Sequence, residues 1–250
     1  MAESFGADPG RYHRARPRYP QALVVRLLAT IPGPDVLDVG IGTGISAEGF
    51  RASGCRVLGV DPDERMADYA RRQGFEVEVA TFEDWRPAGR SFDAVISGQA
   101  WHWVGPAAGA AKAAQVLRPG GCLAVFWNAM EFPPVIGEVF LGAFRRAVPG
   151  APPLSAAPAG LTGYAAFFAD AAEGMRKAGA FTGPEQWQVD WQHSYSRAEW
   201  LEVMPTAGGF NRLEPAILSS VLEEVGAAID ANGGTFTMNY ATVAVTSSRR

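Results

Sequence analysis

The chain has 250 residues, which suits one large domain with a substantial core and hardly allows two independent ones. Apolar residues make up 48% of the chain, which excludes a disordered protein, and a net charge of −4 without long runs of like charge disfavours nucleic acid as a partner. The polar, basic N-terminus lacks the core of a signal peptide and no apolar run reaches the ~18–20 residues of a membrane span, so we expect a cytoplasmic protein without a membrane partner.

The first half of the chain predicts strands that alternate with helices. Strand-like apolar runs cover residues 35–41, 56–61, 76–82, 92–100 and 122–129. Helical patterns cover residues 46–52, 63–73 and 107–117, and the last of them ends at a Pro-Gly-Gly turn. This alternation predicts βαβ units and therefore a parallel sheet.

After residue 129 the alternation stops. Residues 131–183 are rich in Pro, Ala, Gly and Phe, with helical patterns at 134–147 and 164–179, and we interpret them as an inserted helical cap. Strand character returns at 186–196, a helix is expected at 215–231 before an Asn-Gly-Gly stop, and residues 235–247 alternate as a final strand. The two cysteines lie in separate apolar runs and predict buried free thiols.

The most informative motif is VLDVGIGTG at residues 36–44. Its glycines follow a strand and precede a helix: Gly40, Gly42 and Gly44. There the chain must turn sharply and bring bare backbone against a ligand, next to the free N–H groups of a helix N-terminus. The motif predicts a binding loop for a cofactor.

Acidic residues accompany this loop. Asp38 precedes its first glycine, Asp61 ends the second strand where a carboxylate can bind both ribose hydroxyls, and Glu83 and Asp84 follow the third strand near an expected adenine. A plain strand-to-helix turn with Asp61 as an N-cap is one alternative. A dinucleotide is the other, but its usual Gly-x-Gly-x-x-Gly spacing is absent, and Asp38 would repel a pyrophosphate while it suits the ammonium of a methionine moiety.

These motifs, together with TFEDW, SGQAWHWV and VLRPGG, resemble a class I S-adenosylmethionine (SAM)-dependent methyltransferase. The resemblance is to the broad subgroup that includes the trans-aconitate and the ubiquinone/menaquinone methyltransferases, and it covers roughly residues 5–128. It implies a Rossmann-like, doubly wound α/β sheet of seven mostly parallel strands with the last strand antiparallel, in a single domain over residues 1–250. It also implies SAM as cofactor and S-adenosylhomocysteine as product, and it specifies no acceptor.

The resemblance also assigns roles to single residues. The glycine loop packs against the methionine part, Asp61 holds the ribose, and residues 1–20, with a Tyr-x-x-x-Arg-Pro-x-Tyr-Pro pattern, fold over the cofactor as a lid. The expected cofactor-binding residues are Tyr12, Arg16, Asp38, Gly40, Gly42, Gly44, Asp61, Pro62, Met66, Phe82, Glu83 and Gln99.

The acceptor is expected near the WHW run, which leaves the fourth strand at its carboxyl end, where open α/β sheets bind ligands. Trp101 and Trp103 suit a methyl sulfonium because a cation is attracted to ring faces. His102 is a candidate general base, with packing as its alternative role. Tyr164 either belongs to the core of the cap or lines an acceptor pocket.

Three functions remain open at this point. The first is methyl transfer from SAM to oxygen, carbon or nitrogen of a small molecule, and the second is a SAM-binding module without catalysis. The third is an NAD-dependent oxidoreductase, which the glycine spacing disfavours. The three histidines are scattered, so no metal site is expected, and the chain is interpreted as a monomer or homodimer.

Overall fold

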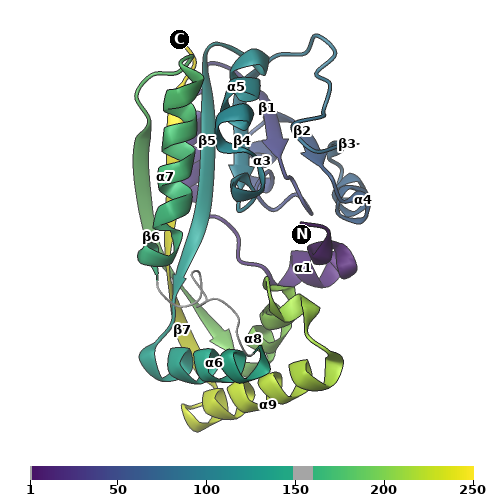
Figure 1. Ribbon diagram of the computed structural model, residues 1–250, viewed down its shortest axis with the longest axis vertical. Coiled ribbons are helices and arrows are strands. Elements are labelled where there is room, and N and C mark those ends of the chain that lie inside the picture. Colours follow the sequence, from purple (N-terminus) through teal and green to yellow (C-terminus); the bar gives the residue numbers. More distant parts are fainter. Residues whose placement is uncertain (1, 149–159) are drawn as a thin grey trace.

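One mixed sheet forms the centre of the computed structural model, which describes residues 2–148 and 160–250 (Figure 1). Within these residues seven strands pair in the order β3-β2-β1-β4-β5-β7-β6. Their bounds are β1 Asp35–Val39, β2 Arg56–Asp61, β3 Glu76–Val79, β4 Phe92–Gly98, β5 Leu117–Glu131, β6 Glu185–Ser196 and β7 Thr235–Ser248. The β1 to β5 pairings are parallel, and β7 runs antiparallel to both β5 and β6, which confirms the predicted fold class.

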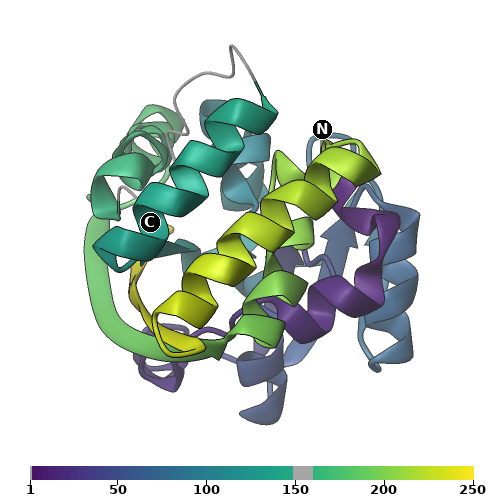
Figure 2. The same cartoon turned by 90° about the horizontal axis from the view of Figure 1, so that it is seen from below.

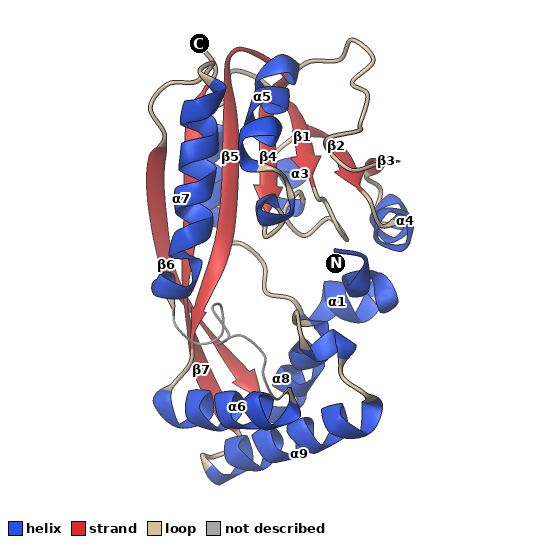
Figure 3. Cartoon of the chain, in the orientation of Figure 1, coloured by secondary structure: helices blue, strands red, loops and turns tan. Residues whose placement is uncertain are grey.

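Alternating side chains give the sheet two buried faces. Along β5, Leu123, Val125 and Trp127 pack on one face, where α5 (Pro106–Val116) and α7 (Leu161–Ala178) lie. The opposite face is covered by α2 (Gln21–Leu28) and α3 (Glu48–Ala52). Figure 3 shows this layering, with α4 (Glu64–Arg72) beside β2 and β3. Both predicted free cysteines are buried.

A second layer lies beyond the carboxyl ends of the parallel strands. We call it the distal layer: α6 (Pro134–Ala147), α8 (Arg197–Val203), α9 (Pro215–Ala231) and the short helices Met204–Thr206 and Phe210–Arg212. The extended ends of β5, β6 and β7 enter it, and α6 and α9 lie side by side (Figure 2). An aromatic core that includes Phe132, Phe140 and Trp200 holds the layer together.

The predicted cap, residues 131–183, contains helices in two different places. Its helix α6 belongs to the distal layer, whereas α7 contacts α5 on the face of the sheet. Residues 149–159 of this segment lie outside the described residues. Residues 197–231, after β6, supply most of the distal layer.

The N-terminal segment lies between the sheet and the distal layer. Its helix α1 (Pro9–Ala15) contacts both α4 and α8. Asp8 caps this helix by accepting the Arg11 backbone N–H, and the Arg11 side chain pairs with Glu202 of α8 at 2.9 Å. None of the described helices combines the length and the hydropathy of a membrane-crossing segment.

Candidate functional site

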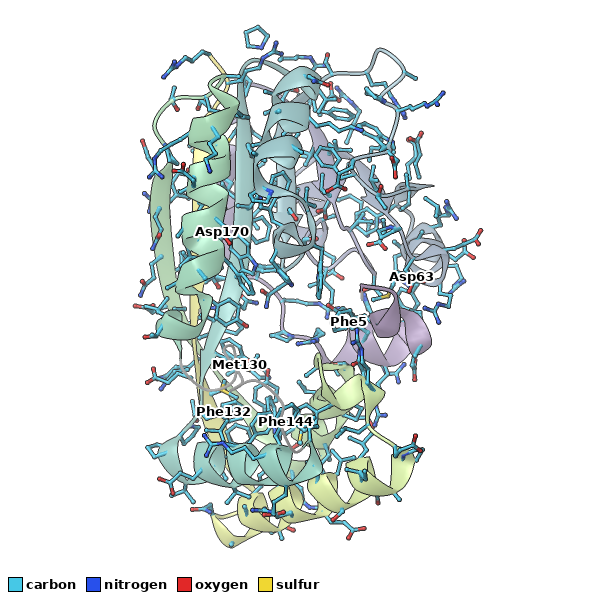
Figure 4. All side chains as sticks on the ribbon, viewed as in Figure 1. Phe5, Asp63, Met130, Phe132, Phe144 and Asp170 are labelled. Atoms are coloured by element: carbon cyan, nitrogen blue, oxygen red, sulfur yellow. The ribbon has the colours of Figure 1, made fainter. Side chains whose placement is uncertain are left out.

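A cavity of about 600 Å³ lies between the sheet and the distal layer. On the sheet side it is lined by residues at the carboxyl ends of β1, β2 and β4, the place where open α/β sheets bind ligands. On the other side it is lined by Phe140, Ala207 and Phe210 of the distal layer. Figure 4 shows Phe5 and Asp63 on the N-terminal side of the molecule and Met130 on the long strand β5; all three line the cavity.

The three glycines of the loop after β1 all have positive φ, at +72° for Gly40, +56° for Gly42 and +96° for Gly44. They are needed for different reasons. A Cβ on Gly40 would collide with Ala100, and one on Gly44 would lie 2.5 Å from the Phe75 ring. A Cβ on Gly42 would meet no atom within 4 Å, because this glycine borders the open cavity.

Asp61 joins this loop to the end of β2. Its Oδ2 accepts the Gly42 N–H at 2.8 Å, and its Oδ1 accepts the Asp63 N–H at 2.9 Å. The carboxylate lines the cavity, and burial raises its pKa to about 6. The side chain therefore fixes the loop and also presents acceptor oxygens to a ligand.

Asp38 is completely buried beneath the loop. The Ser46 hydroxyl donates to its Oδ2 at 2.6 Å, whereas its Oδ1 has no hydrogen-bond partner. Burial raises its pKa to about 7. An unsatisfied carboxylate oxygen beside an open glycine loop fits a ligand that brings a cationic or donating group.

Most of the predicted site residues meet at this cavity. Those that line it are Tyr12, Arg16, Gly40, Gly42, Asp61, Pro62, Met66, Phe82, Glu83, Gln99, His102, Trp103 and Tyr164. Asp38, Gly44 and Trp101 do not. Trp101 is buried in the core, and its ring centroid lies 6.1 Å from that of Phe82. It therefore packs against Phe82, which lines the cavity, without lining the cavity itself.

Gln99 occupies the turn after β4 with a φ of +56°, a strained value for a residue with a Cβ. Its backbone N–H bonds the Phe126 carbonyl at 2.9 Å. Its side chain hydrogen-bonds the Tyr164 hydroxyl and lies 3.4 Å from the Asn128 carbonyl. These contacts hold a polar amide at the centre of the cavity wall.

The ring of His102 is oriented by two aromatic neighbours. The Trp127 indole donates to its Nδ1 at 3.3 Å, and the Phe167 ring stacks on it with centroids 4.6 Å apart. An indole N–H can only donate, so Nδ1 carries a lone pair and the neutral ring carries its proton on Nε2. Burial lowers the pKa of His102 to about 4. In this arrangement His102 offers an N–H donor at Nε2.

Several cavity residues belong to no motif that the sequence analysis used. Ser46 follows the glycine loop, Asn128 and Met130 lie on β5, and Phe210 and Tyr240 come from the distal layer and β7. Asn128 is held by Thr242, whose hydroxyl donates to it at 2.6 Å. The pairing of β5 with β7 brings Asn128, Met130 and Tyr240 together at the site.

Comparisons with known proteins agree with this geometry. The family model "Methyltransferase domain" matches residues 37–125, which include the glycine loop, Asp61 and His102. Uncharacterized methyltransferases of Mycobacterium tuberculosis and Mycobacterium bovis are 39% identical over 133 residues, 52% of this chain and 54% of theirs. A ubiquinone biosynthesis O-methyltransferase of Hahella chejuensis is 37% identical over 103 residues, 38% of this chain and 43% of its own. The chain thus spans about half the length of the curated relatives that it matches.

Solved structures share the fold over nearly the whole chain. A protein of Anaeromyxobacter dehalogenans assigned to the type II methyltransferases superposes with a TM-score of 0.63 and 21% identity over 92% of this chain and 97% of its own. The YcgJ protein of Bacillus subtilis gives a TM-score of 0.53 at 17% identity over the same shares. Residues 37–125 thus match a methyltransferase domain, the chain is similar over about two fifths of its length to ubiquinone and menaquinone methyltransferases, and it shares the fold of these solved structures.

Proposed function

We propose that the protein transfers a methyl group from SAM to a small-molecule acceptor bound in the same cavity. One observation carries the proposal: the open loop at Gly42, fixed by Asp61, borders a cavity whose opposite half is apolar and lies under the distal layer. A cofactor alone would not need this second half. The family match over residues 37–125 supports the reaction class.

The chain's own residues suit the parts of SAM. Asp61 would accept the ribose hydroxyls, Phe82 and Met66 would enclose the adenine, and Glu83 would accept its amino group. The loop at Gly42 would lie against the methionine part, with the unpaired oxygen of Asp38 beneath it. When bound, SAM supplies a methyl group on a sulfonium, which is a strong electrophile.

The remaining residues orient the acceptor and exclude water. Aromatic side chains, among them Trp103 and Tyr164, line the cavity and would favour the cationic sulfonium region. The fixed N–H of His102 can hold an acceptor oxygen in position, and such positioning supplies much of the rate when no base is used.

Calorimetric titration tests the cofactor. We expect SAM and S-adenosylhomocysteine to bind to the purified protein and NAD to give no heat. Binding of NAD in place of S-adenosylhomocysteine would contradict the proposal. Incubation with methyl-labelled SAM and a library of small acids, phenols and amines then separates an enzyme from a non-catalytic module, and mass spectrometry of the product identifies oxygen, carbon or nitrogen as the methylated atom.

A further inference from the structure

The charged residues that line the cavity are unevenly distributed. Among the described residues the acidic ones, Asp61, Asp63 and Glu83, all lie on the side of the sheet where the cofactor is proposed. Another part of the lining comes from β5, β7, α7 and the distal layer, and we call it the acceptor half: Tyr164, Tyr240, Met130, Phe140 and Phe210. The cavity also has the basic side chain of Arg16, which is bonded to Thr206 of the distal layer.

Arg16 has no anionic partner in the described part of the chain. Its Nη2 donates to the Thr206 carbonyl at 2.7 Å, which orients the guanidinium without neutralising it, and its Nε is buried without a hydrogen-bond partner. The neighbouring Arg11 and Arg18 are paired instead, with Glu202 and Glu48. A cation left unpaired at an apolar wall favours an anion from outside the protein.

The charge of Arg16 acts on the acceptor half. Burial raises the pKa of Tyr164 and Tyr240, which line the cavity, and the positive charge of Arg16 opposes that shift in both. Arg16 acts in the same direction on the pKa of Tyr19, which Asp38 also raises. Burial also raises the pKa of Asp38 and Asp61, but there the further causes are hydrogen bonds and neighbouring carboxylates, and Arg16 is not among them. The guanidinium is anchored on the distal layer by the Thr206 carbonyl, lies among the tyrosines of the cavity, and forms no ion pair with Asp38 or Asp61 in the described part of the chain.

We propose that the methyl acceptor is an apolar molecule that carries a carboxylate, and that Arg16 binds this carboxylate while Met130, Phe140 and Phe210 contact the apolar body. The inference rests on the proposed function. It adds the chemical class of the acceptor and assigns Arg16 to that acceptor rather than to the cofactor. A guanidinium suits the role because its planar donors match the two oxygens of a carboxylate.

Pairs of acids and amides of equal shape test the proposal. The protein is first saturated with S-adenosylhomocysteine and then titrated with trans-cinnamate, trans-cinnamamide, octanoate and octanamide. We expect each acid to bind ~10-fold more tightly than its amide, because only the acid makes a charge-assisted contact. Arg16→Gln should abolish this preference. Arg11→Gln, a change to a half-buried arginine of the same segment that is paired with Glu202, should retain it.

The outcomes separate this proposal from the proposed function. Absence of S-adenosylhomocysteine binding to the wild type would contradict the function itself. Normal binding of that product with no preference for the acids, or with no binding of either acid, would overturn only the acceptor class. A preference that survives in Arg16→Gln would overturn the role of Arg16. So would an Arg16→Gln variant that binds S-adenosylhomocysteine more weakly but 5′-methylthioadenosine normally, since that result would assign Arg16 to the amino-acid part of the cofactor.

Discussion

Two carboxylates near the ends of neighbouring strands are buried: Asp38 on β1, beneath the glycine loop, and Asp61 on β2, which lines the cavity. Burial raises the pKa of Asp38 to about 7 and that of Asp61 to about 6, from an ordinary value of 3.8. The unfolded chain releases both protons near pH 4, whereas the folded chain retains them to higher pH. Their contribution to stability is therefore complete below about pH 4 and is lost as the pH rises through 6 to 7.

This linkage predicts that the ligand-free protein loses melting temperature between pH 5 and pH 7.5. The double variant Asp38→Asn/Asp61→Asn should lose less, because the two amides do not titrate. Differential scanning calorimetry at the two pH values measures the effect. The exposed Asp68→Asn change on α4 is the control and should behave as the wild type. An equal loss in the double variant would contradict the assigned burial cost.

Removal of the Asp61 side chain should weaken the binding of S-adenosylhomocysteine. Asp61→Ala loses the proposed charge-assisted ribose bonds and also the bond that fixes Gly42, so we expect a loss of ~1.5–3 kcal/mol in binding free energy. Titration calorimetry measures it, with Asp68→Ala as the matched control. Unchanged affinity would remove Asp61 from the cofactor site.

The protonation of His102 can be measured without knowing the acceptor. With Trp127 donating to Nδ1 and a pKa of about 4, the ring should stay neutral with its proton on Nε2 from pH 8 down to pH 5. Nitrogen NMR of the histidine rings observes this tautomer directly. A protonation midpoint between pH 6 and 7 would instead return His102 to the role of a candidate general base.

At the scale of the elements, two glycines of the loop between β1 and α3 have different roles. Gly42 borders the cavity proposed to bind the cofactor, and Gly44 packs against the Phe75 ring. Gly42→Ala places a methyl group into the cavity, so it should abolish most binding of S-adenosylhomocysteine at a stability cost of ~1–2 kcal/mol from its positive φ. Gly44→Ala places one against the Phe75 ring and should instead lower stability by ~1–3 kcal/mol beyond that cost. Chemical denaturation measures the stability of both variants, and titration calorimetry measures their affinity for S-adenosylhomocysteine. If both variants lost the same affinity and the same stability, the separate roles of Gly42 and Gly44 would be contradicted.

Local signals in the sequence were sufficient for many elements. The helices expected at 134–147 and 215–231 are found at those bounds, because proline begins each of them. The strand expected from residue 122 instead begins at Leu117, since Leu117 pairs with Phe92 of β4 across an irregular register that the Pro-Gly-Gly sequence does not reveal. The helix α8 was missed, although Ser196 and Glu199 form a capping box.

The site shows the same division between local and distant signals. Gly40, Gly42, Asp61 and His102 carry motif signals and line the cavity, whereas their roles in binding stay predictions. Phe210 and Tyr240 carry none, because their place depends on contacts with residues that are far away in the chain. Contacts between distant residues also decide whether a helix such as α7 covers the sheet or joins the distal layer. The sequence of the helix does not decide it, because a helix in either place needs one apolar face.

At the scale of the whole molecule, the N-terminal segment contacts both layers through side chains: Arg18 pairs with Glu48 of α3 on the sheet side, and Arg11 and Arg16 bind Glu202 and Thr206 of the distal layer. We propose that residues 1–20 act as a lid, as the sequence suggested. Saturation with S-adenosylhomocysteine should slow hydrogen exchange at residues 10–21 and leave α9 unchanged. Equal exchange in both states, with saturation shown by calorimetry, would mean that the segment is only a tail.

The three long strands determine how this molecule can open. β5, β6 and β7 remain paired from the sheet to Glu131 opposite Asn239 and Ser196 opposite Thr235, inside the distal layer. Bending the molecule across these strands would break the hydrogen bonds between them, which are worth ~0.5–1.5 kcal/mol each. We therefore expect the distal layer to stay fixed relative to the sheet. The N-terminal helix is attached by side chains alone and has no such restraint. If the proposed lid opens for ligand exchange, we therefore expect the N-terminal helix to move while the distal layer stays in place.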